Sequence, residues 1–114
     1  MLHRRYLVSR LRVGGRSLAL VHGDLLVAAR AETGRLDWEA IVSTVELEEV
    51  SQSRHRLELD CVIETDETLP TKGAVPGHLD TFRGDAFLVR AVDRALVFRG
   101  DGPLEGVDLA SLRG

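Results

Sequence analysis

The sequence predicts an all-β protein: a single domain over residues 1–114, folded as an antiparallel up-and-down meander of about seven strands that closes as a small barrel or sandwich. Apolar and polar residues alternate along most of the chain, as they do in strands that bury one face. Glycine-bearing dipeptides separate the alternating runs, as in tight hairpins. The expected strands span approximately 5–13, 16–22, 25–32, 36–47, 54–64, 81–91 and 95–100.

Three hairpins are expected in the N-terminal third of the chain, with two-residue turns at Gly14-Gly15, Gly23-Asp24 and Thr33-Gly34. Each turn sets which residues lie opposite one another, and a slip of one residue would reverse every side chain. All three turns place large apolar side chains on a common face. That face carries Leu7, Leu11, Val13, Leu18, Leu20, Leu25, Val27, Leu36, Trp38 and Val42.

The phase of the alternation changes after Val42, because the next apolar residues, Val45 and Leu47, stand at odd positions. We expect a β-bulge near Ser43-Thr44 to account for this change. The alternative for residues 36–50 is an amphipathic helix, but the β-branched content of this stretch favours a strand.

The tetrapeptide Phe-Arg-Gly-Asp occurs twice, at residues 82–85 and 98–101. A hairpin turning at Asp93-Arg94 would place both copies at its open end and an apolar face between them. That face would carry Phe87, Val89, Ala91, Leu96 and Phe98. The repeat is interpreted as a strand-end device, because Arg-Gly-Asp as an adhesion signal would need a secreted protein.

Charge is unevenly distributed along the chain. Residues 1–22 hold five arginines and no acid, whereas residues 23–71 hold twelve acids and four arginines. We expect acidic strands to neutralise the basic first strand. Nucleic acid is an unlikely partner, because its binding usually needs a broad basic face and the formal net charge is −3.

Composition excludes several classes of protein. No apolar run is long enough for a transmembrane helix or a secretory signal, so we expect no membrane association and a cytoplasmic location. Cys61 is the single cysteine, which rules out an internal disulfide and favours a buried thiol. Phosphate-loop, dinucleotide and nucleophile-elbow motifs are absent. We therefore expect no cofactor and no metal.

Several polar residues are candidates for a ligand site. Two His-x-Asp triplets, at residues 22–24 and 78–80, place a histidine and a carboxylate at the spacing that shares one face of a strand. Arg83 and Asp85 share the parity of Phe87 and are expected to point inward, pairing with each other or binding an anion. Trp38 is expected in the core or as the wall of a ligand cavity. The candidate ligand-binding residues are His22, Trp38, His78, Asp80, Arg83 and Asp85.

These features favour a non-catalytic binding or interaction module, a homodimeric small β-barrel that recognises a protein partner or a small molecule. The expected dimer rests on a half-apolar second sheet face carrying Val8, Ala19, Val21, Leu26 and Ala28. The alternative is a small cofactor-independent barrel enzyme, an isomerase, cyclase or hydrolase, using His, Asp and Arg at the barrel mouth. The connection over residues 65–80 is long enough to be functional or a surface excursion.

Overall fold

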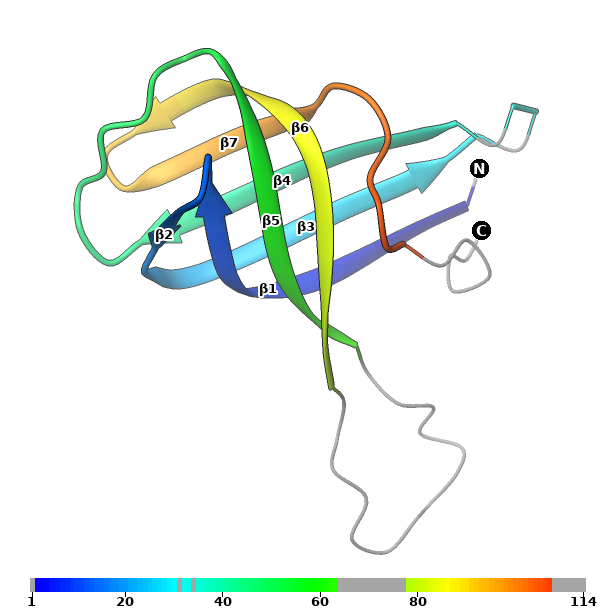
Figure 1. Ribbon diagram of the computed structural model, residues 1–114, viewed down its shortest axis with the longest axis horizontal. Helices are drawn as coiled ribbons and strands as arrows, with labels where there is room; N and C mark the ends of the chain where they lie inside the picture. The colour runs from blue at the N-terminus through cyan, green and yellow to red at the C-terminus, as the bar shows by residue number, and fades with distance from the viewer. Residues whose placement is uncertain (1, 31, 34, 64–77, 108–114) are drawn as a thin grey trace, which may run out of the picture.

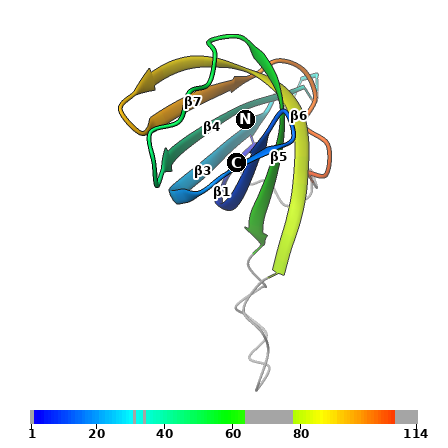
Figure 2. The ribbon, with the colours of Figure 1, turned by 60° about the vertical axis from the view of Figure 1, so that its left-hand side comes forward.

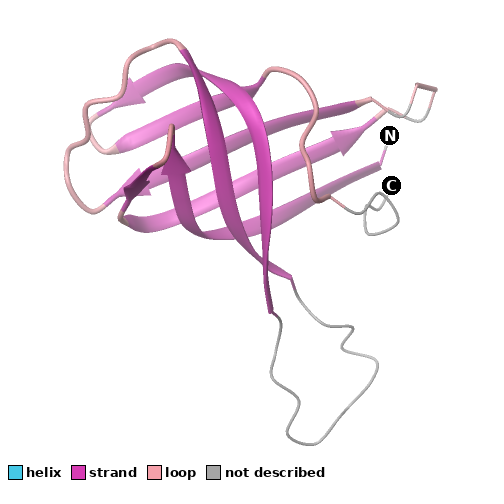
Figure 3. Cartoon of the chain, in the orientation of Figure 1, coloured by secondary structure: helices cyan, strands magenta, loops and turns pink. Residues whose placement is uncertain are grey.

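The computed structural model describes residues 2–30, 32–33, 35–63 and 78–107, and the described part contains strands and loops without helix (Figure 3). The predicted fold class is confirmed: the protein is all-β, and its antiparallel sheet closes into a six-stranded barrel with one extra short strand, β2. Residues 36–44 form a strand, so the helical alternative for this stretch is excluded. The strands are β1 (Leu2–Val13), β2 (Arg16–Leu18), β3 (Leu20–Ala29), β4 (Leu36–Thr44), β5 (Arg54–Ile63), β6 (His78–Val92) and β7 (Ala95–Gly100).

The strands follow the order β2-β1-β3-β4-β7-β6-β5, and pairing of β1 with β5 closes the barrel (Figures 1 and 2). Up-and-down order holds from β1 to β4 and again from β5 to β7. The meander is broken between these two parts, because the connection over residues 45–53 runs along one barrel end to β5 (Figure 1). This crossover lets β4 pair with β7 and β5 pair with β1, which leaves none of the six barrel strands as a long free edge.

The predicted turn at Gly14-Gly15 is confirmed, with Leu11 opposite Leu18. The predicted turn at Gly23-Asp24 is wrong, because both residues lie inside β3. Gly23 is opposite Val42, and a Cβ on Gly23 would approach the Cβ of Val8 to 3.0 Å. The glycine therefore lets β3 pack closely against the neighbouring strand β1 and does not reverse the chain.

The β3–β4 hairpin pairs two residues away from the predicted register. Val27, not Ala29, lies opposite Trp38, and Ala29 lies opposite Leu36. Because the shift is even, each side chain keeps its predicted face. Gly34 of the predicted Thr33-Gly34 turn lies outside the described residues, as does Ala31, which was expected opposite Leu36.

A β-bulge in β1 changes which of its side chains reach the core. The register against β5 shifts between Val8 and Arg10, so an extra residue separates the two halves of the strand. Tyr6 and Val8 are therefore buried in the first half and Leu11 in the second. The prediction that Leu7 belongs to the core is wrong, since this residue is 48% exposed.

A second bulge, in β6, makes part of the predicted apolar face of the last hairpin wrong. Its turn at Asp93-Arg94 is confirmed, but the register against β7 shifts between Leu88 and Arg90. The shift reverses the phase, so Leu88 is buried whereas Phe87 and Val89 face outward.

A third bulge lies in β3, between Leu20 and His22, and it keeps both Leu20 and Val27 in contact with the core. The irregularity predicted near Ser43-Thr44 does lie opposite these residues, but the extra residue, Val21, is in β3 and not in β4. Strand β4 ends at the buried Thr44, and Val45 and Leu47 are exposed in the following connection.

Trp38 fills one end of the barrel between the two Phe-Arg-Gly-Asp copies. A Cβ on Gly84 would lie 2.7 Å from the indole Cζ2, and a Cβ on Gly100 would overlap the same ring. The Trp38 Nε1 donates a hydrogen bond to the carbonyl of Gly102, at 3.1 Å. The repeated glycine therefore makes room for the indole from two strands, which corrects the interpretation of the repeat as a simple strand-end bend.

Cys61 is fully buried, as predicted, among Leu57, Leu59 and other core side chains. Burial and the nearby Asp60 and Asp80 raise the pKa of its thiol to about 12. The thiol therefore stays protonated and unreactive in the folded protein.

Substituting Gly100→Ala is expected to lower the free energy of unfolding by about 2–3 kcal/mol, because the added methyl overlaps the rigid indole. In a Trp38→Leu background the same substitution should cost much less, since the ring is gone. Urea denaturation of the unsubstituted protein, the two single variants and the double variant measures the coupling free energy between positions 38 and 100. Gly14→Ala, at a positive φ of 57° with open space around it, is the control and should cost about 1 kcal/mol in both backgrounds. An equal cost of Gly100→Ala in both backgrounds would contradict the account.

Candidate functional site

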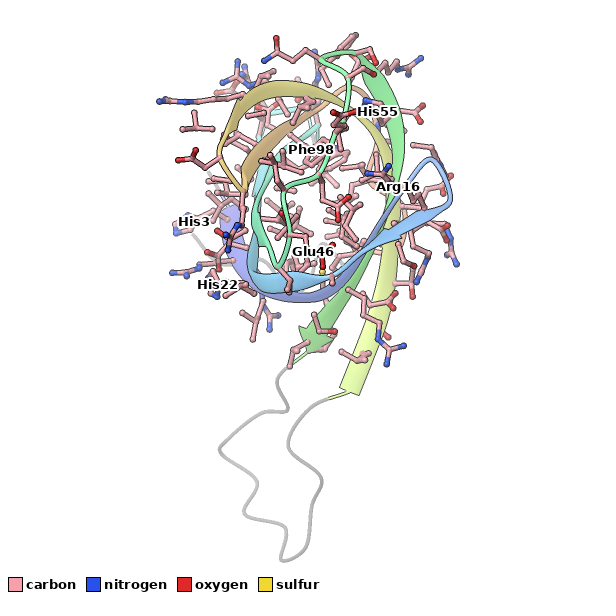
Figure 4. All side chains as sticks on the ribbon, turned by 90° about the vertical axis from the view of Figure 1, so that its left-hand side faces the viewer. His3, Arg16, His22, Glu46, His55 and Phe98 are labelled. Atoms are coloured by element: carbon pink, nitrogen blue, oxygen red, sulfur yellow. The ribbon has the colours of Figure 1, made fainter. Side chains whose placement is uncertain are left out.

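His22 and Asp24 lie on the outer face of β3 and contact each other, as their spacing predicted. The His22 Nε2 is 3.0 Å from the Asp24 Oδ2, and the Arg5 Nε donates to the Asp24 Oδ1 at 2.8 Å. Arg5 and His22 hold the pKa of Asp24 below its usual value, against the opposing effect of burial. His22 points away from the barrel interior (Figure 4). His22 and Asp24 thus belong to a surface ion-pair network and do not line the groove described below, although their partner Arg5 does.

The prediction that Arg83 and Asp85 point inward and pair with each other is wrong. The bulge in β6 places Phe82, Gly84 and Ala86 inside, so the residues between them face outward. Arg83 pairs with Glu58 at 3.1 Å, and Asp85 pairs with Arg54 at 3.0 Å. Both side chains are therefore held in cross-strand ion pairs with β5.

The second His-x-Asp triplet begins β6, where His78 lies opposite Ile63 and Asp80 lies opposite Cys61. The side chain of His78 is outside the described residues, as are residues 64–77 of the predicted long connection. Asp80 is exposed. The triplet stands on a different wall of the barrel from His22, so the structure does not bring the two triplets together.

A groove of about 580 Å³ lies in the described part of the molecule, and of the six candidates only Trp38 lines it. Its outward-facing walls come from two rows of cross-strand neighbours on β1, β3, β4 and β7. The rows are His3–Ala28–Asp37 and Arg5–Leu26–Glu39–Arg99. Leu26 and the small Ala28 form an apolar strip between charged side chains. Trp38 is buried on the opposite face of β4, so the indole supports the groove from beneath.

Positive charge predominates around the groove. Arg4, Arg5, Arg30 and Arg99 line it against two acids, Asp37 and Glu39, which gives a formal charge of +2 with His3 neutral. The whole chain carries −3.

Arg30 pairs with Asp37 at 3.1 Å, and Arg5 pairs with Asp24. Arg4 lies over the Tyr6 ring, 4.8 Å from its centroid. Arg99 is exposed and makes no ion pair within the described residues. The groove therefore presents a cation available to an incoming anion.

Sequence reasoning identified part of this surface. Leu26 and Ala28 were predicted on the second, outer face of the sheet, which is where they lie. Val8 was assigned to the same face, but the bulge in β1 buries it. The positive charge around the groove was missed, because Arg5 and Arg99 enter the same cross-strand row only through the pairing of β4 with β7.

Acidic strands neutralise the basic first strand, as predicted. On β1, Arg12 reaches Glu58 at 3.5 Å and Asp60 at 3.2 Å on β5, and Arg5 reaches Asp24 on β3 at 2.8 Å. Asp60 is 8% exposed and also accepts a hydrogen bond from the Thr81 hydroxyl at 2.7 Å.

Burial alone would raise the pKa of Asp60, but the hydrogen bonds from Thr81 and Arg12 outweigh it and hold that pKa below its usual value. The ionised carboxylate of Asp60 therefore stabilises the junction of β1, β5 and β6.

Neither a metal-binding group of His, Cys, Asp and Glu side chains nor a helix long and apolar enough to cross a membrane is found in the described ranges. Comparison of the chain with protein-family models, curated proteins and solved structures gives no match.

Asp60→Asn should lower the free energy of unfolding at neutral pH by about 2 kcal/mol, because a charged acceptor of two hydrogen bonds is lost. The folded-state pKa of Asp60 lies below its unfolded value. Its contribution is therefore complete above the unfolded pKa and is lost as the pH falls through the folded pKa. Urea denaturation at a series of acidic pH values should show the difference from the unsubstituted protein shrinking. Asp37→Asn, in an exposed pair with Arg30, is the control and should cost less than about 1 kcal/mol. A pH-independent difference for Asp60→Asn would contradict the assignment.

Proposed function

We propose that this protein is a non-catalytic binding module whose ligand site is the outer groove over β1, β3, β4 and β7. The observation that carries the proposal is the groove itself. Its volume of about 580 Å³ falls within the range of roughly 300–1,000 Å³ typical of small-molecule sites. An apolar floor of Leu26 and Ala28 beside placed charges is also the composition that such sites share.

A binding role is favoured over catalysis by the distribution of the polar candidates. His22 contacts Asp24 outside the groove lining, and Arg83 and Asp85 are held in ion pairs on another wall. General acid–base chemistry needs such groups within hydrogen-bond reach of one substrate. The scattered arrangement supports a site that holds a ligand without transforming it.

A protein partner is the second part of the proposal, and the partner is a second copy of the chain. Ile41 and Val97 lie opposite each other on the outer faces of β4 and β7, and Val89 stands beside them at the β6 bulge. Ile41 and Val89 are exposed. Light scattering should give the mass of a dimer at micromolar concentration, and Ile41→Glu should give a monomer. A monomer for the unsubstituted chain would contradict this part.

The cellular location belongs to the same proposal. We place the protein in the cytoplasm, where a single thiol that cannot form an internal disulfide is compatible with a reducing environment.

The groove is tested by NMR with a mixed library of small acids, amines and neutral aromatic compounds. Amide shifts are expected to concentrate at residues 3–5, 26–28 and 37–39, which line the groove. Ala28→Phe should abolish these shifts by filling the floor. Ala91→Phe, at an exposed position on β6 outside the groove, is the control and should leave them unchanged. Shifts that appear elsewhere, or that survive Ala28→Phe, would contradict the site.

A further inference from the structure

We infer that the ligand of the groove is an amphipathic organic anion: an apolar ring or short chain that carries a carboxylate, sulfonate or phosphate group. This inference rests on the proposed function, because it names the chemical class that the same groove selects.

The apolar strip and the cations are adjacent along the strands. Leu26 lies between Arg5 on β1 and Glu39 on β4, and Arg99 on β7 follows Glu39 in the same row. Neighbouring strands lie about 5 Å apart, so this row spans roughly 15 Å from Arg5 to Arg99. A ligand body resting on Leu26 and Ala28 therefore has a guanidinium within reach at either end of the row.

The arginines of the groove differ in whether they already pair with a carboxylate. Arg30 and Arg5 have carboxylate partners, but Arg99 makes no ion pair among the described residues although Glu39 stands opposite it on β4. A guanidinium presents several donors in a plane and binds a carboxylate or phosphate with two parallel hydrogen bonds. Arg99 is thus the group that an anion would engage first, and Arg5 would add a second favourable charge.

Glu39 is the charge that opposes an anion in this row, and it is half-buried beside Leu26. Asp37 is offset by its pair with Arg30. The balance of the lining remains positive on a chain that is acidic overall, so the groove is a local site of attraction for anions. Removing the charge of Glu39 should therefore strengthen anion binding.

The test compares two fluorescent probes with the same aromatic body. 8-Anilinonaphthalene-1-sulfonate carries a sulfonate, and N-phenyl-1-naphthylamine does not. The sulfonate probe is expected to bind at least tenfold more tightly, and added salt should weaken the sulfonate probe alone. Arg99→Gln should weaken the sulfonate probe about threefold to tenfold without affecting the neutral probe.

Arg90→Gln is the matched control, because Arg90 is also an exposed, outward arginine without an ion pair in the described part of the chain, but it lies outside the groove. It should leave the affinity of both probes unchanged. Glu39→Gln should strengthen binding of the sulfonate probe. These variants alter surface charge alone, and an unchanged urea midpoint confirms that each is folded.

The outcomes separate the inference from the function on which it rests. Equal affinity for the two probes, with both lost in Ala28→Phe, overturns the anion class and leaves the groove as a ligand site. Equal effects of Arg99→Gln and Arg90→Gln also overturn it, because the attraction is then general to the surface. Absence of binding by either probe counts against the anion class and the groove together.

Discussion

The packing of the Trp38 indole against two glycine backbones is the constraint on which the rest of the barrel depends. The ring needs space from β6 and β7 at once, and that space exists only because Gly84 and Gly100 lack side chains. Its Nε1 also anchors the chain after β7 through the carbonyl of Gly102. Beyond this bond, Arg83 and Glu105 exchange backbone hydrogen bonds, so the segment after β7 is held against β6. One side chain thus connects β4, β6 and β7 at this end of the barrel.

The groove follows from the same arrangement. Successive residues of a strand face opposite sides, so burial of Trp38 directs Asp37 and Glu39 to the outer surface. Pairing of β4 with β7 then brings Arg99 beside Glu39, and pairing with β3 brings Leu26 to its other side. Opposite faces of β4 therefore contribute to the core and to the proposed site.

The all-β class and most of the N-terminal core were predictable, because alternation and the Gly14-Gly15 turn are local signals. The β-bulges in β1 and β6 were not predictable, because two adjacent apolar residues do not show in the sequence which of them faces the core. Leu7 and Val8 are equally apolar, so only the pairing of β1 with β5 shows which of them is buried. Gly23 was mistaken for a turn for a related reason, because a glycine needed for close approach is identical in sequence to one needed for reversal.

The candidate site was predicted less well than the fold. Trp38, Leu26 and Ala28 were placed on their correct faces, but the site also needs Arg5 and Arg99, which are separated by most of the chain. Their proximity depends on the crossover between β4 and β5, which breaks the expected meander. Arg83 and Asp85 failed as site residues because the bulge in β6 turned them toward cross-strand partners.

The most direct measurement of this account is the fluorescence of Trp38, which is the single tryptophan of the chain. A ring buried between Gly84 and Gly100 should emit at short wavelength and resist quenching by acrylamide until the protein unfolds. Emission at the wavelength of tryptophan in water, with full quenching in the native protein, would show that the indole does not close the barrel.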